Sequence, residues 1–316
     1  MRLVTADGGV LTDILDGTYP IWGEGLSRGA YEKWNRAQSE TVWGRAHLRR
    51  VAWMHDGRVV SSAKRYDLEA WAGEHRIRVV GIGAVFTPPA VRGQRHAGAL
   101  IAALLADATA RGCDLALLFS EIGPAYYERL GFRVVDRHVP TIEIVRRPGA
   151  PAVLVRAGET QDFDAITEIA ARARRGAAFA LDRSADFIAF MLTRKRLLAG
   201  LGPSGLRSVE FFVTEEAHRA VAYVVISRGP HGVYVEDCGD RDPTGARVGA
   251  MLQVLDAREP AEAPLRCRAS IPSGFAPPQW RVVSESPAEE IMMVRSLGEN
   301  PAIIASQTVY PHLDVF

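Results

Sequence analysis

The sequence contains two copies of one pattern, and this duplication restricts the folds open to the chain. A short β-rich segment at Leu3–Ala6 precedes a helical stretch, and Leu154–Ala157 does the same 151 residues later. The same interval separates Gly98–Ile101 from Gly249–Leu252, and each of these opens a helical pattern after a strand-like one. A length of 316 residues suits two domains. We therefore expect a duplicated α/β unit rather than two unrelated domains.

Each copy carries a predicted hairpin followed by a third strand. In the first copy, residues 51–54 and 59–63 flank the turn formers His55, Asp56 and Gly57, and residues 77–86 form the third strand. The corresponding segments of the second copy are 211–213, 220–226 and 233–238. Proline and glycine interrupt both periods near Arg146–Pro151. We expect domains at residues 1–148 and 149–316.

The charge balance excludes some classes of partner. The chain has 38 Lys and Arg against 37 Asp and Glu, so nothing in its net charge favours a nucleic acid or an anionic membrane. Its three cysteines lack the spacing of zinc or redox motifs, and we expect no metal. No uninterrupted apolar run approaches the ~18 residues needed to cross a bilayer. These features predict a cytoplasmic protein.

The segment Val85–Gly98 carries the chemistry. It lies between a predicted strand and the helix whose apolar face is formed by Ala97, Leu100, Ile101, Leu104, Leu105 and Ala108. Backbone N–H groups at such a junction point outward, and the helix dipole favours an anion there. Small residues such as Gly93, Ala97 and Gly98 let a phosphate approach the backbone. The segment therefore predicts a pyrophosphate site.

Two motifs give this site a family resemblance. Arg92–Ala97 is similar to the Q/R-x-x-G-x-G/A signature of the GCN5-related N-acetyltransferases (GNAT), and Tyr126–Phe132 resembles their Y-E-x-L-G-F element. Within that superfamily the chain resembles the fungal lysine N-acetyltransferase group and the tandem-domain "enhanced intracellular survival" acetyltransferases. The resemblance implies an α/β (α+β) fold: tandem acyl-CoA N-acyltransferase domains, each a mixed, mainly antiparallel sheet flanked by helices. It also implies acetyl-CoA as co-substrate.

The resemblance assigns the coenzyme contacts. It places the thioester carbonyl against the backbone of Val85, Phe86 and Thr87, and the pyrophosphate on the loop and helix start. The loop residues so assigned are Arg92, Gly93, Gln94, Arg95, His96, Ala97 and Gly98. Ser120 takes the place of a coenzyme-contacting Asn, or else only closes a turn. Arg95 replaces the first glycine of the signature, so its side chain either obstructs the phosphates or swings outward and adds a contact to them.

Catalytic roles follow from the same resemblance. Tyr127 aligns with the general acid that protonates the thiolate, and Tyr126 is the second choice. The expected base is not visible in the third strand. An α-carboxylate on Phe316, or the side chain of Asp314, folded back into the first domain is a chemical alternative; a frayed or merely packed tail is the other interpretation.

The acceptor site and the second copy are less specified by the sequence. Tyr19, Trp22 and Trp34 surround the expected acceptor cleft, either as substrate contacts or as core. The second copy has Pro243–Val248 in place of the anion loop, so we expect it to lack acetyl-CoA and to wall the cleft.

The predicted activity is acetyl transfer to a primary amine of a small, lysine-like or aminoglycoside-like molecule. A non-catalytic acyl-CoA sensor and a protein lysine acetyltransferase are the alternatives. The sequence indicates neither the acceptor nor the oligomeric state.

Overall fold

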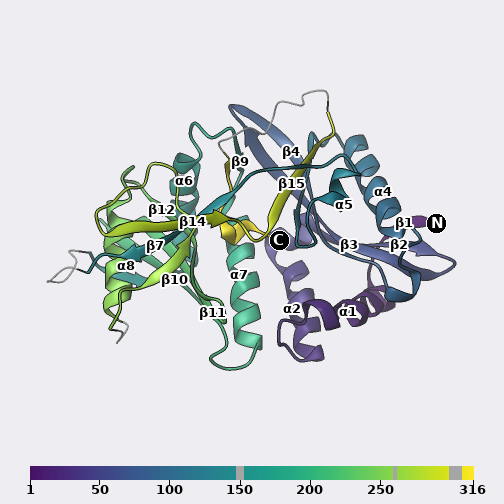
Figure 1. Cartoon of the computed structure of the whole chain (residues 1–316), viewed down its shortest axis with the longest axis horizontal. Coiled ribbons are helices and arrows are strands. Elements are labelled where there is room, and N and C mark those ends of the chain that lie inside the picture. The colour runs from purple at the N-terminus through teal and green to yellow at the C-terminus, as the bar shows by residue number, and fades with distance from the viewer. Residues whose placement is uncertain (147–152, 259–261, 299–307) are drawn as a thin grey trace.

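The computed structural model of the chain describes residues 1–146, 153–258, 262–298 and 308–316, and two mixed, mainly antiparallel β-sheets dominate it (Figure 1). This is the architecture that the sequence predicted. The predicted seam, Arg146–Pro151, lies outside the described residues except for Arg146.

The first sheet has nine described strands. Its main path runs β1 (Arg2–Thr5), β2 (Leu48–His55), β3 (Arg58–Ala72), β4 (His75–Phe86), β5 (Leu115–Ser120), β15 (Ile291–Ser296) and β6 (Arg133–Val134). The strand β9 (Phe179–Leu181) pairs with the far end of β3, and β16 (Thr308–Val309) pairs with β9. Among the neighbours on the main path, only β4 and β5 are parallel.

The second sheet has seven described strands in a comparable arrangement. Its order is β14 (Trp280–Pro287), β7 (His138–Ile144), β13 (Arg266–Ala269), β12 (Gly232–Asp240), β11 (Arg219–Gly229), β10 (Ser208–Glu216) and β8 (Val155–Ala157). The pair β12–β13 is parallel, as β4–β5 is in the first sheet. The predicted hairpins are confirmed as β2–β3 and β10–β11.

Helices cover both faces of each sheet. The helices are α1 (Gly8–Trp22), α2 (Arg28–Glu40), α3 (Val42–His47), α4 (His96–Ala110), α5 (Ala125–Glu128), α6 (Phe163–Ala173), α7 (Ala185–Leu201) and α8 (Ala246–Ala257), with short 3₁₀ turns η1 (Pro89–Val91), η2 (Thr160–Asp162) and η3 (His312–Asp314). The apolar face of α4 packs on the first sheet and that of α8 on the second, and the two helices lie at opposite ends of the molecule (Figure 1). Between the sheets, α6, α7 and the C-terminal segment share one apolar core with strands of both sheets.

Strand exchange joins the two halves. The strand β7, from the predicted first domain, lies in the second sheet between β14 and β13. In return β15, from the predicted second domain, is inserted between β5 and β6, with Met292 and Met293 fully buried. The hydrogen-bonded sheets therefore do not follow a division at residues 148 and 149. Inserting β15 buries its apolar side chains on both faces of the first sheet, which no local pattern in the sequence specifies.

The repeat is visible in the backbone at the start of each strand-following helix. The cap of α4 is Arg95, with φ +62°, and the cap of α8 is Gly245, with φ +72°. Both are left-handed, a conformation that usually requires glycine. The caps are 150 residues apart, so the structural repeat differs by one residue from the sequence interval at this point.

Candidate active site

The centre of the first domain is a gap between two parallel strands. Strand β4 pairs with β5 only from Val79 to Ile82, opposite Leu115 to Leu118. Beyond this point β4 turns away from β5 through a bulge at Ala84, which has φ +47° and falls at a register shift against β3. A bulge of this kind bends a strand and frees backbone groups from the ladder. The divergence leaves a slot open toward the start of α4.

The loop at the end of this slot presents a row of free backbone donors. Within the described part of the chain, none of the N–H groups from Gly93 to Gly98 donates to an acceptor, and no side chain caps α4. Free N–H groups at a helix N-terminus, together with its dipole, form an anion site. The loop itself is held by Arg92, whose Nε donates to the carbonyl of Thr87 at 3.1 Å.

Arg95 adopts the backbone conformation of the glycine that it replaces. Its positive φ keeps the loop in the left-handed turn, at a strain of about 1–2 kcal/mol for a residue with a Cβ. The side chain is exposed. This geometry corresponds to the outward orientation that the sequence left open.

The second copy fills the equivalent position with its own carboxylate. The buried Asp240 accepts hydrogen bonds from the N–H groups of Arg247 (2.8 Å) and Val248 (3.4 Å) at the start of α8. By the structural repeat these correspond to Ala97 and Gly98, whose N–H groups are free. An internal anion thus occupies in the second domain the place that is open in the first.

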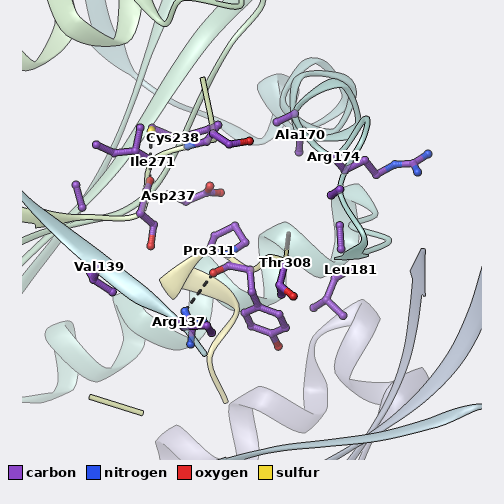
Figure 2. A pocket seen from close by; sticks show the side chains of 18 of the residues that line it. Arg137, Val139, Ala170, Arg174, Leu181, Asp237, Cys238, Ile271, Thr308 and Pro311 are labelled. Carbon is purple, nitrogen blue, oxygen red and sulfur yellow. Dashed lines mark hydrogen bonds between the residues drawn. The ribbon is translucent and has the colours of Figure 1, made fainter. Parts of the chain in front are cut away.

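The gap between β12 and β13 is also filled by the chain itself. The C-terminal segment enters here: the N–H of His312 donates to Ser270 Oγ at 2.9 Å, and the ring of His312 stacks on Tyr234. The adjoining cavity has a volume of about 550 Å³. Figure 2 shows Pro311 and Thr308 of the tail on one side of it and Asp237 and Cys238 of β12 on the other. Arg137 Nη2 donates to the carbonyl of Tyr310 at 3.2 Å (dashed in Figure 2). The second domain thus holds the tail in its own slot.

From this anchor the tail crosses into the first domain. Asp314 is fully buried, 3.0 Å from Arg183 Nε, and Arg194 Nη2 donates to the carbonyl of Val315 at 2.6 Å. The C-terminus consequently lies in the middle of the molecule, between the two halves (Figure 1). The interpretation of a frayed tail is wrong, because hydrogen bonds and apolar burial fix it.

The ring of Phe316 lies on the first sheet where two glycines make room. It packs on Tyr66 with a centroid distance of 4.3 Å, and a Cβ on Gly81 would come within 2.5 Å of the ring. A Cβ on Gly83 would lie 3.3 Å from the ring and 3.5 Å from the carboxyl-end oxygen of Phe316. That oxygen therefore lies over β4 immediately before the bulge at Ala84.

One cavity, about 470 Å³, brings these features together. Its lining includes Val85 from the strand, Tyr127, and Phe316 from the tail. Trp22 and Trp34, two of the aromatic residues predicted around an acceptor cleft, also line it. Tyr19 is not among its lining residues: the hydroxyl of Tyr19 donates to the carbonyl of Leu26 at 2.9 Å and its ring packs on Tyr31.

Tyr127 has the protonation state that an acid needs. It lies on α5 and is 7% exposed, and within the described residues its hydroxyl makes no hydrogen bond. Burial first, then Tyr126 and Glu121, raises the pKa of Tyr127 to about 12. Its proton is therefore present throughout the neutral range and free to be donated. Tyr126 packs edge-on against Tyr127 and does not line the cavity.

Other predicted coenzyme residues have local partners. Ser120 Oγ donates to the carbonyl of Gly123 at 2.7 Å, which corresponds to the turn-closing alternative. The Phe86 ring points toward α1, where it contacts Trp22 and the backbone at Gly17, so only its main chain can face a ligand in the slot. His96 is buried, and its Nε2 lies 3.2 Å from Gln94 Oε1.

The described residues contain no cluster of three or more His, Cys, Asp or Glu side chains able to hold a metal ion. No helix in the described ranges is long and apolar enough to cross a membrane.

Residues 24–135 match the family model of the acetyltransferase (GNAT) domain, which spans the slot, the loop and Tyr127. No curated protein matches the chain. Among solved structures, it is similar to a probable N-acyltransferase from Enterococcus faecalis V583 (13% identity, TM-score 0.68, 94% of this chain and 72% of that one). A GCN5-related N-acetyltransferase from Anabaena variabilis ATCC 29413 gives 13% identity and a TM-score of 0.67 over 94% and 73%. Eis1 from Mycobacterium abscessus gives 13% and 0.58 over 94% and 74%.

At these identities the solved structures show the fold, in which both halves of the chain take part. The family match adds the class: the chain is an enzyme with a GNAT acetyltransferase domain at residues 24–135. The two halves of the chain repeat one fold, each around its own sheet.

The attachment of the tail should depend on pH. One guanidinium, Arg183, faces two buried carboxylates, Asp237 and Asp314, so burial first and the second aspartate next raise the pKa of Asp314 to about 7. An acid whose pKa is higher in the folded state contributes most below its unfolded value near 4, and loses this contribution as pH rises through about 7. We expect wild-type stability, measured by urea unfolding, to fall between pH 5 and 7.5 more than that of Asp314→Asn. Parallel pH profiles for the two proteins would contradict this.

Proposed function

We propose that the first domain transfers the acetyl group of acetyl-CoA to a primary amine of a small molecule. The observation that carries this proposal is the row of free N–H groups from Gly93 to Gly98 beside the open slot. The second copy supplies an internal comparison, since there Asp240 and the tail fill both places. The first copy leaves open the place that the chain's own groups fill in the second, and this place suits a ligand with an anionic head and an extended arm.

Acetyl-CoA has this shape. Its pyrophosphate would bind the N–H groups of the loop, and its pantetheine arm would follow β4 in the slot. The thioester would then lie near Val85, at the bulge, where a backbone N–H can polarise the carbonyl. Arg92 and Arg95, both exposed at the mouth of the loop, add positive charge for the phosphates.

Tyr127 and the carboxyl group of Phe316 would supply the acid and the base for acetyl transfer at this cavity. The amine attacks the thioester carbonyl carbon, and the carbon–sulfur bond breaks as the tetrahedral intermediate collapses. Tyr127, with its raised pKa, gives its proton to the leaving thiolate. A protonated acceptor must lose one proton before its nitrogen can attack, and the nitrogen loses a second proton from the tetrahedral intermediate. An α-carboxylate on Phe316 over Gly83 would accept one of these protons directly or through water. The other passes to solvent, from which Tyr127 is reprotonated. Tyr126 supports Tyr127 by packing.

The second domain serves as a wall and as an anchor. Arg194 and Leu198 of α7 line the acceptor cavity, and the tail closes it from the same side. A cavity of about 470 Å³ lined by residues of both halves favours a small acceptor over a lysine on a protein surface. A non-catalytic sensor would bind acetyl-CoA without turnover, and the free hydroxyl of Tyr127 argues for turnover.

The coenzyme site is tested by calorimetry with acetyl-CoA. We expect one molecule to bind per chain, and the variant Gly93→Val/Ala97→Leu to lose binding, because a β-branched residue is strained at φ +79° and the larger side chains cover the N–H groups. Asp240→Asn in the second domain is the control and should leave the stoichiometry at one. A folded wild-type protein that does not bind acetyl-CoA would refute the proposed function.

The acid is tested by Tyr127→Phe, which removes one oxygen. Loss of a general acid typically costs about 10²–10⁴-fold in rate. We expect kcat, measured by thiol release, to fall in this range. The Kd for acetyl-CoA should stay within twofold of the wild-type value. Tyr126→Phe should retain most of the activity. Equal losses in the two variants would assign the tyrosines a packing role.

The tail is tested by deleting Val315 and Phe316, with a variant carrying one added glycine after Phe316 for comparison. Both changes should lower kcat about 10²-fold or more without weakening acetyl-CoA binding, because each removes a carboxylate from its place over Gly83. Full activity in both variants would exclude Phe316 from the reaction.

A further inference from the structure

Three basic side chains line the acceptor cavity without an acidic partner. Arg50 projects from β2, Lys64 from β3 and Arg194 from α7. Within the described residues they bond only to neutral groups: Arg50 Nη2 to Asn35 Oδ1 (2.8 Å), Lys64 Nζ to Gln38 Oε1 (2.8 Å), and Arg194 to the carbonyl of Val315.

Burying these basic groups without an acidic side chain as partner is costly. Arg50 is 8% exposed, and its Nη1 is buried without a hydrogen-bond partner. Burial, followed by repulsion from Arg50 and Arg194, holds the pKa of Lys64 well below its usual range. Buried charges are normally paired, because desolvation penalises them otherwise. A ligand that brings negative charge would relieve all three groups.

The α-carboxylate proposed for Phe316 lies over Gly83, on the strand beside Lys64, and would set one negative charge against the three positive ones. The remaining charged side chains around the cavity are paired among themselves or lie at its opposite end. Glu24 pairs with Arg207 (2.7 Å), Lys195 with Glu236 (2.8 Å) and Glu290 with His312 (3.3 Å). Glu121 lies close enough to Tyr127 to affect its pKa, at the end where acetyl transfer is proposed. The cavity is therefore bipolar, with a carboxylate near the reacting tyrosine and a basic cluster on β2 and β3.

We infer that the acceptor amine carries a carboxylate, which binds among Arg50, Lys64 and Arg194 while the amine faces Tyr127. This inference rests on the proposed function and narrows its acceptor class. A polycationic acceptor such as an aminoglycoside would place positive charge against the basic cluster, where like charges repel. An amino acid with a chain between its two ends matches both poles. Trp34 of α2, whose ring centroid lies 5.4 Å from Lys64 Nζ, gives that chain an apolar wall.

Matched acceptors test the inference directly. We would compare ω-amino acids from 4-aminobutanoate to 8-aminooctanoate with the alkylamine and the α,ω-diamine of equal length. Thiol release gives kcat/KM, and calorimetry in the presence of coenzyme A gives binding even without turnover. Hydrogen bonds to charged groups contribute about 1.5–3 kcal/mol, so the best-fitting amino acid should exceed both partners of its length roughly tenfold or more. The difference should appear in KM, because the carboxylate is remote from the reacting atoms.

Lys64→Met keeps the length of the side chain and removes its charge. In this variant the ω-amino acid should lose its advantage over the alkylamine. Lys33→Met, an exposed lysine on α2, is the matched control and should keep the full preference.

Equal or better use of alkylamines or diamines by the wild type would overturn the inference and leave acetyl transfer intact. Binding of no ω-amino acid by an enzyme that binds acetyl-CoA would overturn it as well. If the protein bound ω-amino acids but not acetyl-CoA, the basic subsite would be supported and the proposed function would be refuted.

Discussion

The short parallel pairing of β4 and β5 determines where this protein can do chemistry. Four residues of each strand are paired, and the bulge at Ala84 then separates them. Every functional element takes its position from that divergence. The slot leads to the free N–H groups of the loop, the opposite face of β4 carries glycines on which Phe316 lies, and Tyr127 reaches the cavity from the helix after β5. The same divergence in the second copy, between β12 and β13, has become an anchor for the tail.

The two copies therefore share one backbone geometry at the helix start and use it in opposite ways. In the first, a left-handed cap at Arg95 holds a loop whose donors are unused; in the second, Gly245 holds a loop whose donors meet Asp240. The second copy stabilises its helix start internally and can no longer offer it to a ligand. Its contribution moves to the acceptor side, through α7 and through the segment that carries Phe316 into the first domain.

Local patterns in the sequence were enough to predict the repeated strand–helix order, the hairpins and the loop before α4, because each depends on neighbouring residues. The exchange of β7 and β15 could not be predicted this way. Ile291–Ser296 has the composition of a strand, but its partner is set by the apolar surface that β5 and β6 leave between them. The basic cluster was also missed. The only sign of this cluster in the sequence is that Arg50 stands next to the apolar Val51, and Lys64 next to the apolar Ala63. Each pair lies in a strand that is mostly buried there.

The insertion of β15 and of the tail has a consequence for the order of synthesis. The loop and helix proposed to bind coenzyme are synthesised well before β15 and Phe316, which come later in the chain. Domains otherwise tend to fold from the N-terminus as they appear. Here the sheet of the first domain stays incomplete, with the edge of β5 uncovered, until β15 has been synthesised. A chain that terminates before β15 would thus expose an aggregation-prone edge, and a completed first sheet reports that synthesis has passed β15.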